Sequence, residues 1–245
     1  MGSAMSLGML ATPASASTPG TVVHHSSTSS VVGGVNGKFA VKSAAKNSTL
    51  IAGYSGAPSA GILSDTSTFT APSFTCANST DIEDFSIGPY IYDSTGYEDA
   101  ASDIQFVCVD GAPYYSISAY TGEGGNNYVF NVTAGDVISA TLSENATTGE
   151  TTAVTTDLTT GYTVTSAQAN GADGNPDVAL SEGVLTYYAD VPTFTTITQA
   201  NCLINGVPIK SAGLTLYNLK GGHDVQVKTD PAKGSTLENV FKANT

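Results

Sequence analysis

The sequence contains no arginine and no tryptophan, and only eight of its 245 residues are basic, all of them lysine. Against these stand 21 acidic residues, which gives a formal net charge of −13 at pH 7. Proteins that bind nucleic acids neutralise phosphates with clustered lysine and arginine, so this composition excludes a nucleic-acid partner. No apolar run is long enough to span a bilayer, and we expect no membrane partner either.

The few bases are absent from the middle of the chain. Residues 47–209 contain no lysine and carry eighteen of the 21 acidic residues. The self-repulsion of such a block falls when carboxylates are protonated, which favours a protein that works in acid or in a cation-rich medium. The alternative interpretation is that the charge serves solubility alone.

The first residues resemble an export signal. Residues 5–11 (MSLGMLA) form a short apolar run, and Ala14-Ser15-Ala16 has the small residues that a signal peptidase accepts. We therefore expect residues 1–16 to be a signal-peptide-like segment and the protein to be secreted. Residues 17–48 are rich in Ser, Thr, Gly and Val and poor in large apolar groups, which predicts a disordered linker or pro-segment.

The remainder of the chain predicts an all-β fold. Thr, Ser, Gly and Asn dominate it, and short stretches of period-two alternation recur between turn signals. Two turn-like tetrapeptides, residues 147–150 (TTGE) and 159–162 (TTGY), are twelve residues apart and indicate successive hairpin turns. Residues 129–132 and 137–142 flank a turn and are expected to form another hairpin. We predict a two-sheet antiparallel β-sandwich of the concanavalin-like, jelly-roll type over residues 49–228.

Residues 229–245 are predicted to be a C-terminal tail. Its one structural signal is Ser235-x-x-Glu238, which resembles a helix capping box.

Three cysteines in an exported chain indicate one disulfide and one free thiol. Cys76 and Cys108 each lie at the end of a strand-like run and are the expected pair. Cys202 lies in an apolar strand, where a buried free thiol is ordinary.

Several segments resemble the glutamic peptidases, or eqolisins, in order and spacing. The resemblance extends from about Tyr54 to Val227 and rests on these residues: Ala52-Gly53-Tyr54, Phe69 to Cys76 (FTAPSFTC), Ser86-Ile87-Gly88, Cys108 with Gly111 to Tyr115, Val132 to Ile138 (VTAGDVI), Asp157 to Tyr162, Ser181 to Leu185 (SEGVL), and Asn205-Gly206-x-Pro208-Ile209. The fold so implied is a concanavalin-like sandwich of two long curved antiparallel sheets.

The resemblance also implies a mechanism. Members of the family are acid endopeptidases in which a Glu carboxylate takes a proton from water and a Gln amide stabilises the oxyanion. Glu182 falls in the segment that matches the family's Glu. The position of the Gln falls between Asp99 and Ala101, where the chain has no Gln, and the family's Trp residues are absent. One hypothesis is that Asp99 faces Glu182 and shares a proton with it, so that the protonated partner replaces the missing amide donor.

Two other groups of residues are candidate binding sites. Tyr gives both an apolar face and a hydroxyl, so tyrosines on one face of a curved sheet are suited to extended peptides or sugars. The candidates for such a groove are Tyr90, Tyr92, Tyr97, Tyr115 and Tyr187. Asp173-x-Asn175-x-Asp177 resembles the first half of a calcium loop but lacks its glycine and its final Glu, so a solvated turn is the more frequent explanation.

These observations leave three functional interpretations open. The first is a secreted, catalytically degenerate homologue of the glutamic peptidases, whose groove binds extended peptide or glycan in the extracellular medium. The second is an active acid endopeptidase that uses Glu182 and Asp99. The third is a lectin-like glycan- or calcium-binding module, since one fold serves many functions. None of the three needs a cofactor, with calcium the exception in the third.

Overall fold

The computed structural model describes residues 46–58, 62–76, 83–94, 96, 98–122, 125–145, 147–148, 150–168, 177–186, 191–221 and 224–242. The strands are β1 (Lys46–Ser48), β2 (Ile51–Gly56), β3 (Ser64–Thr70), β4 (Phe74–Thr75), β5 (Glu83–Asp93), β6 (Glu98–Val109), β7 (Ala112–Thr121), β8 (Gly125–Val129), β9 (Val137–Glu144), β10 (Thr151–Asp157), β11 (Thr163–Gln168), β12 (Asp177–Leu185), β13 (Thr193–Phe194), β14 (Ile197–Ile204), β15 (Val207–Pro208), β16 (Thr215–Gly221), β17 (Asp224–Lys233) and β18 (Thr236–Phe241). A 3-10 turn, Ile209–Ser211, is the helical element of these residues, and the described part has no helix that could cross a membrane.

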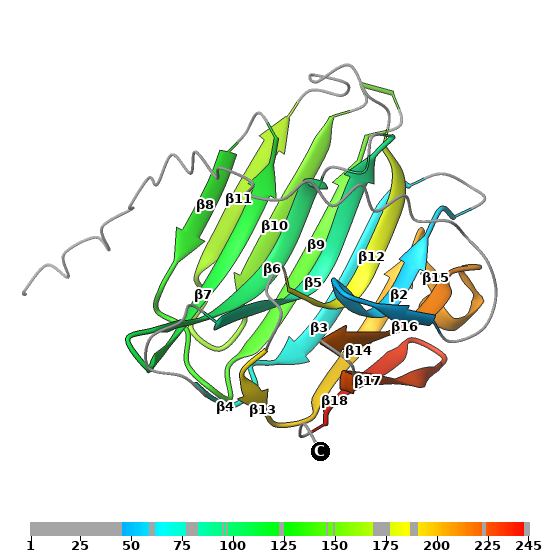
Figure 1. Cartoon of the computed structure of the whole chain (residues 1–245). Helices are drawn as coiled ribbons and strands as arrows, with labels where there is room; N and C mark the ends of the chain where they lie inside the picture. Colours follow the sequence, from blue (N-terminus) through cyan, green and yellow to red (C-terminus); the bar gives the residue numbers. More distant parts are fainter. Residues whose placement is uncertain are drawn as a thin grey trace, which may run out of the picture.

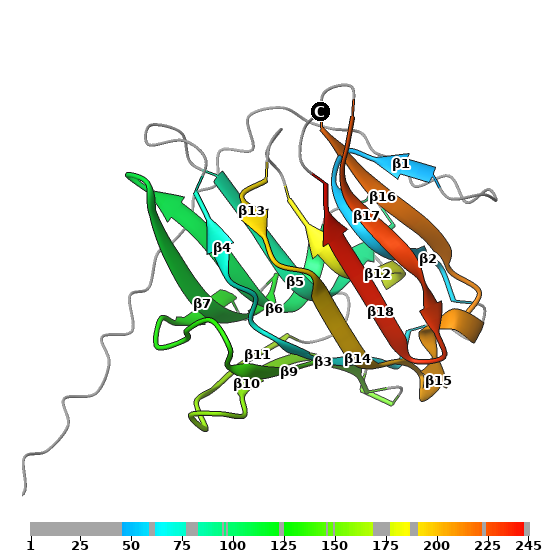
Figure 2. The same ribbon diagram turned by 90° about the horizontal axis from the view of Figure 1, so that it is seen from below.

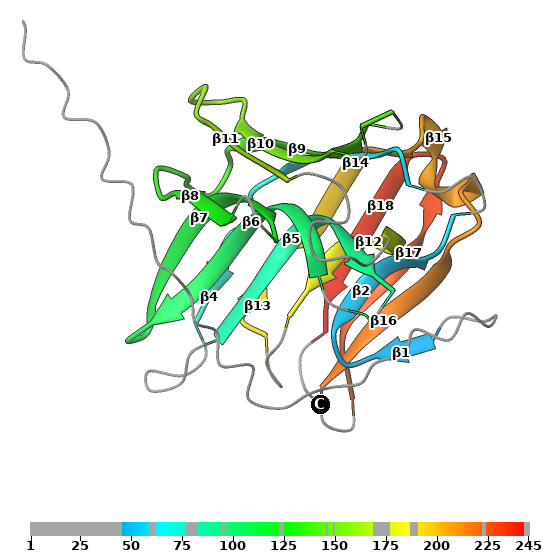
Figure 3. The ribbon, with the colours of Figure 1, turned by 90° about the horizontal axis from the view of Figure 1, so that it is seen from above.

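One large sheet folds back on itself to make two layers. Its strands follow the order β11-β10-β9-β3-β14-β18-β17-β16-β2-β12-β5-β6-β7-β8, with β1 added to β16 and β15 to β14. In Figure 1 the layer from β2 to β8 lies in front of the layer from β11 to β14. Figure 3 shows the two layers as facing rows that β18, β17 and β16 connect at one side. The predicted antiparallel β-sandwich is therefore confirmed, and β1, outside the main strand order, pairs with β16 in parallel.

Alternating burial explains why these segments form strands. In β10 and β3 every second residue is buried, and in β9 the buried residues are Ile138, Ala140 and Leu142. The main core lies between the two layers. A smaller cluster covers the face of the front layer that is turned away from the back layer, which we call the outer face; it consists of Ile51, Tyr90, Tyr92, Ala101, Leu185 and Tyr217.

Aromatic side chains close one end of the core. The short strands β4 and β13 pair with each other and bring Phe74 opposite Phe194 (Figure 2). Phe74 contacts Phe85 and Phe106 edge to face, and these two stack with ring centroids 4.3 Å apart. The predicted disulfide, Cys76–Cys108, joins the end of this segment to β6, so its pairing is confirmed. Cys202 is a buried free thiol, as expected.

Two sequence-based predictions about strand connections were wrong. Residues 129–132 and 137–142 do not form a hairpin, because β8 pairs with β7 whereas β9 pairs with β10 and β3. Residues 236–241, expected in a tail outside the sandwich, form β18, which pairs with β14 and β17. The sandwich therefore continues to Phe241, past the boundary expected at residue 228. β9, β10 and β11 are successive antiparallel strands, as the hairpin turns expected from the two tetrapeptides require.

Three glycines lie side by side across β2, β12 and β5. Gly183 pairs with Gly53 on one side and with Gly88 on the other. Their φ angles are +156° at Gly53, +148° at Gly183 and +158° at Gly88, a region that strongly favours glycine. A Cβ at Gly53 would collide with the Glu182 carbonyl oxygen, and a Cβ at Gly183 with the Ala52 carbonyl oxygen. This glycine row therefore fixes the register of β12 at the centre of the front layer.

Replacing Gly183 with alanine should destabilise the fold strongly. The change adds both backbone strain and a collision with a neighbouring strand, and we expect it to lower the free energy of unfolding by about 3 kcal/mol or more. The matched control is Gly161→Ala, whose φ is also positive at +82° but whose Cβ would meet nothing within 4 Å. Gly161→Ala should lower the free energy of unfolding by about 1 to 2 kcal/mol. Urea unfolding measures both, and equal losses would contradict the importance of the collision.

Candidate functional site

The outer face of the front layer contains a half-open pocket. Its volume is about 190 Å³, and β5, β6, β8, β12 and the residue after β12 line it. The lining residues are Asp84, Phe85, Ser86, Tyr90, Glu98, Asp103, Gln105, Tyr128, Leu185 and Thr186. Three of them are carboxylic acids and none is a base, so the pocket is acidic.

Strand alternation places the polar residues of this pocket. On β5, Asp84 and Ser86 reach the pocket, whereas the intervening Phe85 packs in the main core. On β6, Asp103 and Gln105 reach it in the same way. Ser86 and Gln105 are direct cross-strand partners, so the two strands present their polar groups side by side.

Asp103 is the most deeply buried acid of the pocket. Burial raises its pKa to about 7, although hydrogen bonds from Ser118, Ser86 and Gln105 oppose the rise. The Ser118 hydroxyl donates a short hydrogen bond to Asp103 Oδ1. The Tyr90 hydroxyl donates to Ser86 Oγ over 2.8 Å, which leaves the Ser86 proton for Asp103.

Asp84 is the second acid with a displaced titration. Burial raises its pKa to about 7, and the nearby charge of Asp103 adds to the effect. Two carboxyl groups that repel each other and titrate near neutrality can hold a proton in the pocket at mildly acidic pH. They release this proton at higher pH. A cation in the pocket would stabilise their charged forms.

Glu182 does not lie on this outer face. Its neighbours of the same parity on β12, Leu180 and Val184, belong to the main core, and Glu182 is 0 % exposed between the layers. Gln199 of β14 donates a short hydrogen bond to Glu182 Oε1, and Asp65 and Ser67 of β3 lie next to it. The residue that the resemblance implied as the general base is thus closed off from the pocket.

Asp99 lies in a different part of the sandwich from Glu182. Its side chain is 9 % exposed, and Gln168 of β11 donates a 2.6 Å hydrogen bond to Asp99 Oδ2. Glu182 has Gln199 and Asp65 as its neighbours instead. The hypothesis of a proton shared between Asp99 and Glu182 therefore has no support in the structure, because each carboxyl group meets a different glutamine.

The predicted tyrosine groove is found only in part. Tyr90 lines the pocket and Tyr92 belongs to the outer-face cluster. Tyr115 points to the other side, because its ring packs against Phe74 with centroids 4.9 Å apart, and it is no groove residue. Tyr97 and Tyr187 lie outside the described residues.

The weak calcium candidate also lies mostly outside the described residues. This applies to Asp173 and Asn175, whereas Asp177 begins β12 and its side chain is not described. Within the described residues, no group of three or more His, Cys, Asp or Glu side chains is arranged to hold a metal ion.

Sequence reasoning missed the polar groups of the pocket: Asp84, Ser86, Glu98, Asp103, Gln105, Ser118 and Tyr128. A signal existed, since Asp103 and Gln105 alternate with the buried Ile104 and Phe106, and such polar positions in a strongly apolar strand point out of the core. The signal becomes a site only when β5 is known to pair with β6, and β6 with β7.

Comparison with known proteins shows the fold. No protein-family model and no curated protein sequence matches the chain. Among solved structures, scytalido-glutamic peptidase with a peptide-based transition-state analogue aligns at a TM-score of 0.59 and 14% identity, over 79% of this chain and 100% of that chain. SCP-B, a member of the eqolisin family of peptidases in complex with the tripeptide Ala-Ile-His, aligns at 0.54 and 14% identity, over 78% and 97%. The chain thus has the fold of the glutamic peptidases.

The Ser118 hydroxyl should control the titration of Asp103. Removing this donor in Ser118→Ala removes a hydrogen bond to the charged form, so the pKa of Asp103 should rise above 7, by about one unit. Carboxyl ¹³C chemical shifts followed against pH measure the change. Ser116→Ala on the same strand is the control, since Ser116 is not among the groups hydrogen-bonded to Asp103. An unchanged Asp103 titration in Ser118→Ala would refute this account.

Proposed function

We propose that this chain is a secreted binding protein with the glutamic-peptidase fold, which holds an extended peptide on its outer face and a basic side chain of that peptide in the acidic pocket. The observation that carries the proposal is the pocket itself: three carboxylic acids in a cavity with no base. The disulfide is compatible with secretion, because such bonds persist in oxidising compartments.

The walls of the pocket are suited to a lysine or arginine side chain. Leu185 and the ring of Tyr128 offer apolar surface to a methylene stem. Asp84 and Asp103 would supply the charge at the end. The protein itself has no base in residues 47–209, so none of its own side chains from that range can occupy this place.

Two further observations favour a peptide and disfavour catalysis by Glu182. The solved structures with this fold include proteins bound to a peptide-based analogue and to a tripeptide. Glu182, in contrast, is buried behind the sheet and held by Gln199, where it reaches neither the pocket nor a ligand on the outer face. A protein that has lost the Glu–Gln chemistry of the family but has kept a surface for peptides would explain both observations.

A lysine-containing peptide should bind better than its norleucine analogue, which has the same stem length without the charge. We expect a preference of about tenfold or more, the usual size of a hydrogen bond to a charged group. Affinity for the lysine peptide should fall as the pH drops below about 7, because Asp84 and Asp103 then become protonated. Isothermal titration calorimetry with paired peptides between pH 5 and about 8 measures both effects.

The variant Asp103→Asn should remove the preference for lysine and leave norleucine binding unchanged. Asp230→Asn is the control, since Asp230 is an exposed acid on β17 bound to Lys228. Equal affinity for the two peptides in the unchanged protein would refute the acidic pocket as the binding site. Binding of oligosaccharides without peptide binding would indicate the lectin-like alternative.

A second function, endopeptidase activity, is favoured by the contact between Asp103 and Gln105. A carboxyl group with a pKa of about 7 next to a side-chain amide combines a proton acceptor, once the pH approaches 7, with a donor for an oxyanion. Cleavage of a denatured-protein mixture, scanned by mass spectrometry from acid to neutral pH, tests it. Cleavage abolished in Asp103→Asn and kept in Glu182→Gln would establish this activity, and absence of cleavage would leave the binding function.

A further inference from the structure

Two carboxylic acids from opposite layers meet in the main core. Asp65 belongs to β3 of the back layer and Glu182 to β12 of the front layer, and both are 0 % exposed. The two side chains are neighbours, and each affects the pKa of the other. β3 and β12 are not paired in the sheet, so this contact joins the layers through the core.

No described cation balances this pair. The titratable groups that face it from the packed strands are the Cys202 thiol of β14 and the Tyr54 hydroxyl of β2. The Tyr54 hydroxyl accepts the Ala232 N–H at 3.0 Å. Lys228 of β17 is exposed and bound to Asp230 at 2.6 Å. Two ionised carboxylates without a counter-charge in a dry core would cost several kcal/mol, so the pair must keep a proton.

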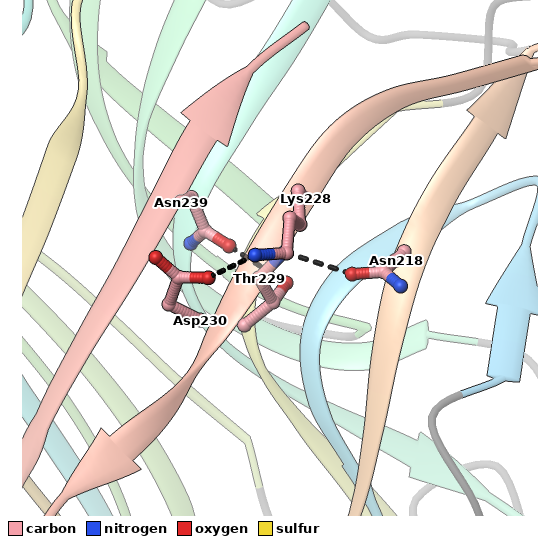
Figure 4. A network of polar contacts seen from close by, with 5 residues as sticks. All are labelled: Asn218, Lys228, Thr229, Asp230 and Asn239. Carbon is pink, nitrogen blue, oxygen red and sulfur yellow. Dashed lines mark hydrogen bonds and ion pairs between the residues drawn. The ribbon is translucent and has the colours of Figure 1, made fainter.

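A directed chain of amide groups ends on Glu182. The Thr229 hydroxyl donates to Asn239 Oδ1 at 2.9 Å, Asn239 Nδ2 donates to Gln199 Oε1 at 3.3 Å, and Gln199 Nε2 donates to Glu182 Oε1. Figure 4 shows the outer end of this chain, where the Thr229 N–H also donates to Asn218 Oδ1. Donors that point toward Glu182 favour its charged form and leave the proton to Asp65.

The remaining oxygen atoms of the pair find no partner elsewhere. Among the described residues, both Asp65 carboxyl oxygens, Glu182 Oε2 and the Ser67 hydroxyl are buried and have no hydrogen-bond partner. Buried polar groups are almost always hydrogen-bonded, so a proton between Asp65 and Glu182 is what satisfies this group.

We propose that Asp65 and Glu182 form a buried proton-binding site, in which a proton on Asp65 is donated to the Glu182 carboxylate and ties the two layers of the sandwich together. The proposal is independent of the outer-face pocket. It gives Glu182 a role in a pH-sensitive lock within the core.

The lock should make the fold most stable in acid. Burial raises the pKa of Asp65 well above its ordinary range, and the neighbouring Glu182 raises it further; burial also raises the pKa of Glu182. In the unfolded chain both groups lose their protons near pH 4. The folded state therefore holds more protons above that pH, and stability falls as the pH rises from about 4 toward the raised pKa values.

The experiment compares melting temperatures between about pH 4 and 8 in the unchanged protein and in Asp65→Asn. The asparagine keeps an N–H donor for Glu182 but cannot ionise, so the contribution of the pair to the fall in Tm with pH should shrink to roughly half, since one of its two ionisable groups is gone. Glu238→Gln, an acid on β18 that points away from the core, should keep the full slope. Equal slopes in all three proteins would overturn the proposal.

Infrared spectroscopy gives a readout that needs no variant to fold. At about pH 8.5, above the range in which Asp84 and Asp103 titrate, the unchanged protein should still show the carbonyl band of a protonated carboxyl group. Asp65→Asn, where it folds, should lack the band and Glu238→Gln should keep it. Absence of the band in the unchanged protein would mean that the pair is ionised and that no proton joins the layers.

Discussion

Buried acids without bases are the constraint on which this structure depends. Between Lys46 and Lys210 the chain offers no positive side chain, so acids inside the sandwich must be satisfied by neutral groups. Asp157 caps its own turn by accepting from the Thr159 and Thr160 N–H groups, and Asp99 accepts from Gln168. Asp103 accepts from serine hydroxyls. Asp65 and Glu182 have only each other and an amide, and so they require a proton.

The pocket and the core pair use the same chemistry with different access. Asp84 and Asp103 line a half-open pocket, so either protons or a cationic ligand in it can neutralise their charge. Asp65 and Glu182 are closed, and only a proton can reach them when the core opens briefly. The proposed cation binding and the proposed core proton therefore respond to pH in opposite ways: rising pH charges the pocket acids, whereas it favours loss of the proton that joins the layers. The two overlap around neutrality, where Asp84 and Asp103 ionise and Asp65, with its raised pKa, still holds its proton.

Local signals predicted much of the fold and little of the site. The sandwich, the Cys76–Cys108 bond and the turns of β9–β10–β11 follow from alternation, spacing and turn residues, all of which are short-range. The sequence places Thr236–Phe241 in a tail beyond the sandwich because its capping signal is local, whereas its pairing with β14 and β17 is not. The pocket is hidden from the sequence for the same reason, because strand pairing is not local. Asp84 and Asp103 are 19 residues apart on paired strands, and only the sheet order shows that they share a pocket.

The side of the sheet on which Glu182 lies is a matter of register, which a family resemblance in sequence does not determine. A slip of β12 by one residue would bring Glu182 to the outer face, since successive side chains of a strand alternate between faces. The glycine row prevents that slip, because it would bring a residue with a Cβ to the place of Gly183, where the Ala52 carbonyl oxygen and Gly53 leave no room for it. Glu182 does meet a glutamine, Gln199, but in a place closed to solvent and peptide.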